Sequence, residues 1–203
     1  MCGITGISSN KPVSANIINS LKKLEYRGYD SAGIATLFEG EIKEVKSEGR
    51  VDSLEENFDL KNLKGNIGIG HVRWATHGVP NSINAHPHSS DNVSVVHNGI
   101  IENSTILKKY LITKGHKFKS QTDTEVIVHL ITENLQTSEL EEAITKTLKQ
   151  LHGSFALGII FRDIPDLIVG ARRGSPLAVG YGPSENYLGS DSYALKSMTN
   201  KIT

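Results

Sequence analysis

The chain has 203 residues, and its 22 lysines and arginines balance its 22 aspartates and glutamates. This balance argues against a basic surface for nucleic acid or for an anionic membrane. No apolar run approaches the roughly eighteen residues that cross a bilayer, and the N-terminal segment lacks the pattern of a secretory signal. Cys2 is the only cysteine, so no internal disulfide can form, and we expect a cytoplasmic protein.

Predicted strands and helices come in groups along the chain. In chain order, the pattern predicts a strand at 2–7, a helix at 14–27, paired strands at 32–38 and 41–47, a short helix from 53, a strand at 66–74, a loop at 79–91, a strand at 93–97, helices at 102–114, 122–135 and 138–151, strands at 154–161, 167–172, 177–181 and 187–190, and a short helix at 191–197. This grouping predicts an α+β fold with antiparallel sheets in one domain.

Four of the predicted helices begin with a capping signal. Ser14 stands where an N-cap residue would stand. Three later pairs have the spacing of a capping box, namely Ser53 with Glu56, Thr122 with Glu125 and Ser138 with Glu141. We therefore expect these side chains to bond the free N–H groups of their helices.

Cys2 directly follows the start methionine. Removal of Met1 would leave a thiol and a free α-amine on one residue, and the α-amine has a pKa of about 7.7–8.0. Such a residue could act as both nucleophile and base, as in N-terminal threonine enzymes. The alternative is that Cys2 is a small apolar residue opening a strand.

Two arginines each have two interpretations. Arg27 either complements the negative end of its helix or anchors the start of the chain. Arg73 offers a planar fork for a carboxylate, and the N–H groups of Thr76-His77-Gly78 could face the same anion. Alternatively, Arg73 is a surface arginine whose stem lies on Trp74.

Two further segments carry candidate groups. Asn98-Gly99 is a tight-turn signal, but an asparagine amide beside a glycine N–H is also a natural pair of oxyanion donors. Asp123 either favours the positive end of its helix or holds a ligand ammonium group. Together, the nucleophile, the oxyanion pair, Arg73 and Asp123 suit an α-amino acid with a side-chain acyl group, such as glutamine.

Several histidines fall within a short span, namely His71, His77, His86, His88 and His97. They suggest a metal hydrolase as a rival function. However, no pair has helical ligand spacing and no cysteine accompanies them, so we expect loop or packing histidines and no metal. A second rival is a non-catalytic amino-acid-binding domain, which would use Arg73 and Asp123 but not Cys2.

The chain resembles the class II glutamine amidotransferases over nearly its whole length. The similar segments are CGI (2–4), YRGYDSAG (26–33), RWATHG (73–78), NAHPH (84–88), VHNGIIEN (96–103) and TDTE (122–125). The segment YRGYDS is similar to the glucosamine-6-phosphate synthase branch. Phosphoribosyl-pyrophosphate amidotransferases, the alternative branch, usually read HRGQDS there.

The resemblance implies an N-terminal-nucleophile hydrolase fold, a four-layer αββα sandwich of two antiparallel sheets between helix layers. It implies that residues 2–203 form a glutaminase domain that is truncated at its C-terminal end and needs no cofactor. The partners it implies are L-glutamine and, through sugar isomerase domains absent from this chain, fructose 6-phosphate. The full-length enzyme is then expected to be a homodimer.

The resemblance also implies a role for each candidate residue. Cys2, with Met1 removed, is the nucleophile, its α-amine is the base, Arg27 orders the Cys2 region, and Asn98 and Gly99 form the oxyanion hole. Arg73, Thr76 and His77 bind the glutamine α-carboxylate, Asp123 and the Gly99 carbonyl bind the α-ammonium, Trp74 lies at the ammonia exit, and His86 belongs to the glutamine-site loop.

Overall fold

The computed structural model describes residues 1–203 and contains eleven strands, six α-helices and two 3-10 turns. They are β1 (Gly3–Ser9), α1 (Ser14–Leu24), η1 (Glu25–Arg27), β2 (Ser31–Phe38), β3 (Glu41–Glu48), α2 (Asp52–Asn57), η2 (Leu60–Asn62), β4 (Ile67–Arg73), β5 (His88–Ser89), β6 (Val93–Ile101), α3 (Ser104–Thr113), α4 (Glu125–Leu135), α5 (Leu140–Gln150), β7 (Gly153–Phe161), β8 (Ile164–Arg173), β9 (Ala178–Tyr181), β10 (Glu185–Gly189), α6 (Ser192–Leu195) and β11 (Lys201–Ile202).

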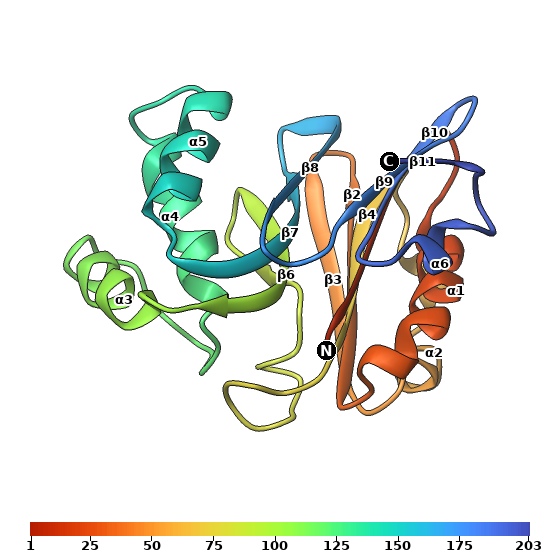
Figure 1. Cartoon of the computed structure of the whole chain (residues 1–203), viewed down its shortest axis with the longest axis horizontal. Helices are drawn as coiled ribbons and strands as arrows, with labels where there is room; N and C mark the ends of the chain where they lie inside the picture. The colour runs from red at the N-terminus through yellow and green to blue at the C-terminus, as the bar shows by residue number, and fades with distance from the viewer.

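Two antiparallel sheets face each other between two layers of helices (Figure 1). Helices α1, α2 and α6 cover the outer face of one sheet, and α3, α4 and α5 cover the outer face of the other. This arrangement confirms the α+β, four-layer αββα expectation. None of the helices combines the length and the apolar content needed to cross a bilayer.

The first strand lies inside the larger sheet, not at its edge. This seven-stranded sheet has the order β11-β9-β10-β1-β4-β2-β3. Thr5 of β1 is opposite Gly189 on one side and Gly70 on the other. Hydrogen bonding on both sides fixes the backbone that directly follows Cys2.

The smaller sheet has the order β5-β6-β7-β8, and its strand β6 carries the candidate site residues Asn98 and Gly99. The sequence predicts that β6 ends at residue 97, but the strand continues to Ile101. Asn98 and Gly99 are paired with Ala156 and Phe155 of β7. The tight-turn interpretation of Asn98-Gly99 is therefore wrong, because both residues remain in the sheet ladder.

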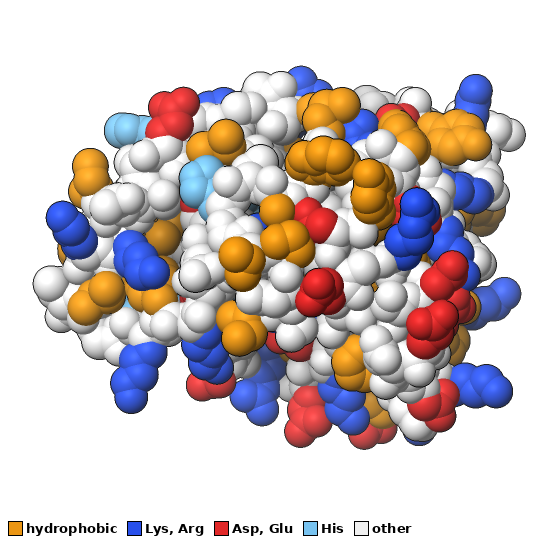
Figure 2. All heavy atoms as spheres, turned by 90° about the horizontal axis from the view of Figure 1, so that it is seen from below, with side chains coloured by type: hydrophobic (Ala, Val, Ile, Leu, Met, Phe, Trp, Pro, Cys, Tyr) orange, Lys and Arg blue, Asp and Glu red, His pale blue; other side chains and the backbone are white.

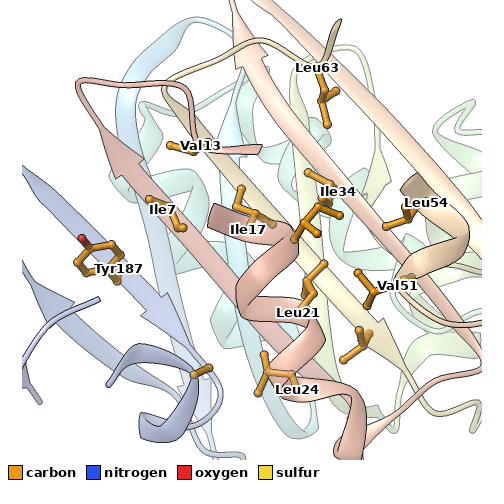
Figure 3. Packing of buried hydrophobic residues seen from close by; sticks show 14 of the residues in the cluster. Ile7, Val13, Ile17, Leu21, Leu24, Ile34, Val51, Leu54, Leu63 and Tyr187 are labelled. Carbon is orange, nitrogen blue, oxygen red and sulfur yellow. The ribbon is translucent and has the colours of Figure 1, made fainter. Parts of the chain in front are cut away.

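Apolar side chains fill three layers of the sandwich. Figure 3 shows Ile17, Leu21 and Leu24 of α1 lying over β1, near Ile7. Each fully buried leucine or isoleucine contributes about 1.5–3 kcal/mol. The glycines of β4 allow α1 to pack closely against the sheet, because a Cβ atom on Gly70 would lie 2.6 Å from Ile17. A second cluster lies beneath α3, α4 and α5, and a third fills the space between the sheets.

The predicted helix caps are wrong. Ser14 is itself the first helical residue, and no side chain caps α1, α2, α4 or α5. The N-cap positions of α1, α2 and α4 have helical dihedral angles, whereas a capping side chain reaches the free N–H groups from an extended backbone. Glu125 instead accepts hydrogen bonds from the backbone of Lys119 and Ser120.

Candidate active site

The Cys2 thiol lies against the backbone at the end of β4. Its Sγ atom is 3.3 Å from the nitrogen of Trp74 and 3.5 Å from the oxygen of the same residue. Partial burial raises the pKa of the thiol, and the N–H of Trp74 only partly offsets this shift. The thiol is therefore protonated at neutral pH and needs a base to become a nucleophile.

Two donors converge on the carbonyl oxygen of Cys2. Arg27 Nε donates to it at 2.9 Å, and Asn98 Nδ2 donates to it at 3.0 Å. Arg27 is buried and is also paired with Asp191, 3.4 Å away. Residues from η1 and β6 thus hold the same peptide group in place, next to the thiol. This geometry favours the anchoring interpretation of Arg27.

Asn98 is fixed by a hydrogen bond across the two sheets, and Gly99 has a conformation that few other residues could adopt. The Oδ1 atom of Asn98 lies 3.0 Å from Nε2 of His71, a buried residue of β4. Gly99 has a φ of +125°, and a Cβ atom there would lie 2.0 Å from the oxygen of Ser154. A side chain at this position is excluded by both the backbone angle and the space.

Arg73 is buried, so the interpretation of a surface arginine lying on Trp74 is wrong. Its guanidinium donates to the carbonyl oxygens of His77 and Gly78, the latter at 3.1 Å, and lies 3.9 Å from Asp30. The segment after β4 therefore folds around the arginine. In this conformation, backbone carbonyl oxygens accept hydrogen bonds from some of the guanidinium N–H groups that would bind a carboxylate.

Asp123 lies before α4 and is buried. Its Oδ2 atom accepts a hydrogen bond from the backbone nitrogen of Ile101 at 2.7 Å. This bond ties the loop before α4 to β6, two residues beyond Gly99. The neighbouring Thr124 hydroxyl binds His97 at 2.9 Å and His86 at 3.1 Å. Two of these hydrogen bonds join the loop to β6, and the third joins it to His86 in the segment before β5.

The candidate residues line two cavities that both border Cys2. A cavity of about 20 Å³ is lined by Cys2, Arg73, Trp74, Thr76, His77, His86, Gly99 and Asp123, among others. This volume holds about one water molecule and is too small for an amino acid. A second cavity, of about 230 Å³, also borders Cys2 and is lined by Arg27 and Asn98, among others.

The surface beside the second cavity is apolar. Met1, Trp74 and Ile100 line this cavity and are all exposed. The ring of Tyr29 meets the ring of Trp74 edge-on, with the centroids 5.6 Å apart. Figure 2 views the molecule from below and shows hydrophobic side chains in small groups among polar and charged ones. Trp74 thus borders both the closed cavity and an open apolar surface.

Burial explains the state of the clustered histidines. It lowers the pKa of His71 and His88 to about 3 and that of His97 to about 4, so these rings are neutral at physiological pH. The rings of His71 and His86 are 4.2 Å apart. No group of three or more histidine, cysteine, aspartate or glutamate side chains is arranged to hold a metal ion.

Two contacts of the site involve His71, which the sequence placed only among the histidines of the rival metal hydrolase, and Asp30, to which it assigned no function. His71 binds Asn98, as described above, and Asp30 accepts a hydrogen bond from the backbone nitrogen of Ala75. Asp30 also lies close to Arg73. Nothing in the spacing of His71 or Asp30 distinguishes them from other polar residues near strand ends, because both contacts depend on the pairing of strands that are distant in sequence.

Residues 71–197, more than half of the chain, match the family described as glutamine amidotransferase domain. The chain belongs to this family. Glutamine–fructose-6-phosphate aminotransferases (isomerizing) of Mesorhizobium japonicum and Zymomonas mobilis are 54% and 51% identical to it. Each alignment covers 100% of the chain and 34% of the relative, so this amidotransferase chain spans about a third of their length.

Solved structures of other amidotransferases share the fold. The glutamine phosphoribosylpyrophosphate amidotransferase of Bacillus subtilis aligns with a TM-score of 0.84 and 30% identity, over 96% of this chain and 43% of that chain. A glutamine aminotransferase class-II domain protein of Silicibacter pomeroyi aligns with a TM-score of 0.63 and 16% identity, over 93% and 88%. The second likeness concerns the fold alone. The N-terminal-nucleophile type of sandwich expected from the sequence is thereby confirmed.

Proposed function

We propose that this chain hydrolyses L-glutamine to L-glutamate and ammonia through a thioester on Cys2. The observation that carries the proposal is the position of the Cys2 thiol. Cys2 borders the small cavity that Gly99, Arg73 and Asp123 also line, and its carbonyl oxygen accepts a hydrogen bond from Asn98 Nδ2. Membership of the glutamine amidotransferase family supports glutamine as the substrate.

The chemistry begins with removal of Met1, since the nitrogen of Cys2 is otherwise part of a peptide bond. The freed α-amine takes the thiol proton, and the thiolate attacks the side-chain amide carbon of glutamine. Asn98 Nδ2 and the Gly99 N–H stabilise the oxyanion of the tetrahedral intermediate. The α-amine returns the proton to the leaving nitrogen, which departs as ammonia. Water then hydrolyses the thioester to glutamate.

The remaining residues hold the substrate. In the proposal, Arg73 binds the α-carboxylate with Thr76 and His77, and Asp123 and the Gly99 carbonyl bind the α-ammonium group. Arg73 exchanges its present carbonyl partners for the carboxylate when the segment after β4 opens and closes again. Trp74, at the border of the apolar surface, lies where ammonia leaves, and His86 supports the loop around the substrate.

In the intact protein, we propose that the ammonia passes to fructose 6-phosphate and gives glucosamine 6-phosphate. The relatives with this activity in their names are about 50% identical over the whole chain, whereas the phosphoribosylpyrophosphate amidotransferase is 30% identical. Tyr26 and Tyr29 also disfavour the phosphoribosylpyrophosphate alternative. On this proposal, residues 2–203 belong to one glutaminase domain, and sugar isomerase domains supply the sugar site and the homodimer contacts.

The test is a glutaminase assay on protein whose N-terminus has been defined by intact-mass measurement. Chain lacking Met1 releases ammonia from glutamine, and Cys2→Ala abolishes this release. The matched control inserts an alanine between Met1 and Cys2, which keeps the thiol but blocks the α-amine, and it is expected to be inactive too. Normal hydrolysis by Cys2→Ala, or by protein that retains Met1, overturns the mechanism.

A further inference from the structure

His71 connects the two sheets at the position of Asn98. It lies on β4, faces the space between the sheets, and is fully buried. Its Nε2 atom is 3.0 Å from the Asn98 side-chain oxygen and 3.0 Å from the backbone oxygen of His97. One ring nitrogen thus meets two oxygens of β6, on consecutive residues.

These contacts determine where the proton of His71 lies. A carbonyl oxygen only accepts hydrogen bonds, so Nε2 must carry the proton and donate to both oxygens. The other ring nitrogen, Nδ1, is buried and has no partner. Burial lowers the pKa of His71 to about 3. The ring is therefore neutral, with one donor and one lone pair.

The donor also determines the orientation of the Asn98 amide. With Oδ1 toward His71, the Nδ2 group points toward Cys2 and donates one of its two hydrogens to the Cys2 carbonyl oxygen. A flipped amide would place two N–H groups against the Nε2–H of His71 and an oxygen against the oxygen of Cys2. Both contacts would be repulsive, and the burial of Asn98 and His71 makes such unpaired polar groups costly.

We propose that His71 is a positioning residue that holds the Asn98 amide with its free Nδ2 hydrogen toward the oxyanion formed at Cys2. This inference rests on the proposed glutaminase function. Without the His71 donor, the amide can turn its oxygen toward the developing negative charge, and the oxyanion site loses a donor. Loss of one such donor lowers kcat by roughly 100- to 1000-fold. A donor that is misoriented only part of the time produces a smaller loss.

Two replacements separate the donor from the bulk of the ring. His71→Met keeps a similar volume without a donor, and we expect kcat to fall by about 10- to 100-fold with KM changed by less than about threefold. His71→Gln places an amide N–H near the position of Nε2, and we expect it to recover most of the loss. His88→Met is the matched control, because His88 is equally buried but binds Thr122 instead of Asn98. His88→Met should leave kcat within about twofold of the value for the unsubstituted protein.

A double-mutant cycle with Asn98→Ala tests whether His71 acts through Asn98. In that background, His71→Met should lower kcat by less than about twofold further. If His71→Met lowers kcat by the same factor in both backgrounds, or if His71→Gln is no better than His71→Met, the inference is wrong.

A measurement without turnover separates this inference from the proposed function. The side-chain NH₂ resonances of Asn98 in an ¹⁵N NMR spectrum should shift and broaden in His71→Met, and should stay near their original positions in His71→Gln and His88→Met. Unchanged resonances in His71→Met overturn the inference even if the enzyme hydrolyses glutamine. An inactive parent enzyme overturns the proposed function, while the resonances still report whether His71 orients the amide.

Discussion

Arg27 Nε donates a hydrogen bond to the carbonyl oxygen of Cys2 at 2.9 Å, although the two residues lie 25 positions apart in the sequence. The same guanidinium is paired with Asp191, just before α6. Cys2 is therefore held by a planar guanidinium group that is itself fixed by its contact with Asp191. A lysine has the charge but not the fork that reaches both partners.

Arg27→Lys should therefore lower kcat by about tenfold or more, because a nucleophile that is misplaced by about 1 Å loses rate. KM should change little, since Arg27 does not line the small cavity. Steady-state kinetics on protein without Met1 measure both quantities. Arg162→Lys is the control, because this exposed arginine bonds only the carbonyl oxygen of Gly40. A kcat for Arg27→Lys equal to that of the control contradicts the prediction.

Gly99→Ala should prevent stable folding of β6 against β7. The added Cβ atom would lie 2.0 Å from the Ser154 oxygen, at a φ of +125°. We expect a loss of more than about 3 kcal/mol in the free energy of unfolding, measured with urea. Gly115→Ala is the control, because its φ is +91° and nothing lies within 4 Å of the new atom. It should cost about 1 kcal/mol. Equal losses would show that contact with Ser154 is unimportant.

Asp123→Asn should weaken glutamine binding without unfolding the site. The amide oxygen of asparagine can still accept the hydrogen bond from Ile101, but the negative charge is gone. Loss of a charge-assisted bond of about 2 kcal/mol raises KM about 30-fold. We expect kcat to stay within about threefold. Asp163→Asn, at an exposed turn, is the control. A normal KM for Asp123→Asn contradicts the proposed ammonium site.

The stability of the protein should fall with acid over a defined range of pH. The pKa values of His71, His88 and His97 are about 3, 3 and 4 when folded, whereas an unfolded histidine has a pKa of about 6.5. Below about pH 6.5 the unfolded chain binds protons that the folded chain excludes. Each histidine can therefore lower the free energy of unfolding by up to about 1.4 kcal/mol per pH unit, down to its folded pKa.

Urea unfolding at several pH values between about 7.5 and 5 measures this slope. Glu125 does not contribute there. Burial raises its pKa, but hydrogen bonds from His129, Lys119 and Ser120 outweigh burial and hold the pKa at about 2, so its effect begins below about pH 4.5. His88→Gln should flatten the slope, and exposed His152→Gln should not. An unchanged slope in His88→Gln would contradict the prediction.

The sequence predicted local structure well where a periodic pattern decides it. The strands of the hairpin β2 and β3 begin and end within one residue of the predicted bounds. The prediction of helix caps failed because a capping signal is a pattern of side chains. A side chain can cap a helix only if the backbone of the residue before the helix is extended. Val13 and Val51 are helical at those positions. β11 was missed because two residues carry no period.

The candidate site could be predicted as a set of residues but not as an arrangement. Cys2, Arg73 and Asp123 were chosen from their chemistry and from the resemblance, and they line one cavity. The contact of His71 with Asn98 depends on how β4 faces β6 across two sheets. No local pattern encodes that pairing. The small volume of the cavity likewise depends on the contacts of Arg73 with backbone carbonyl groups. Because every residue has such a group, the sequence does not reveal these contacts.

The central position of β1 has a consequence for the order of events during synthesis. The backbone nitrogen of Ile4 bonds the hydroxyl of Ser190, which lies 186 residues away. The first strand therefore cannot be enclosed on both sides until almost the whole chain has left the ribosome, which takes about ten seconds or more. During that interval the start of the chain remains accessible to an aminopeptidase. On the proposed mechanism, this interval allows Met1 to be removed before the strand that follows Cys2 is enclosed.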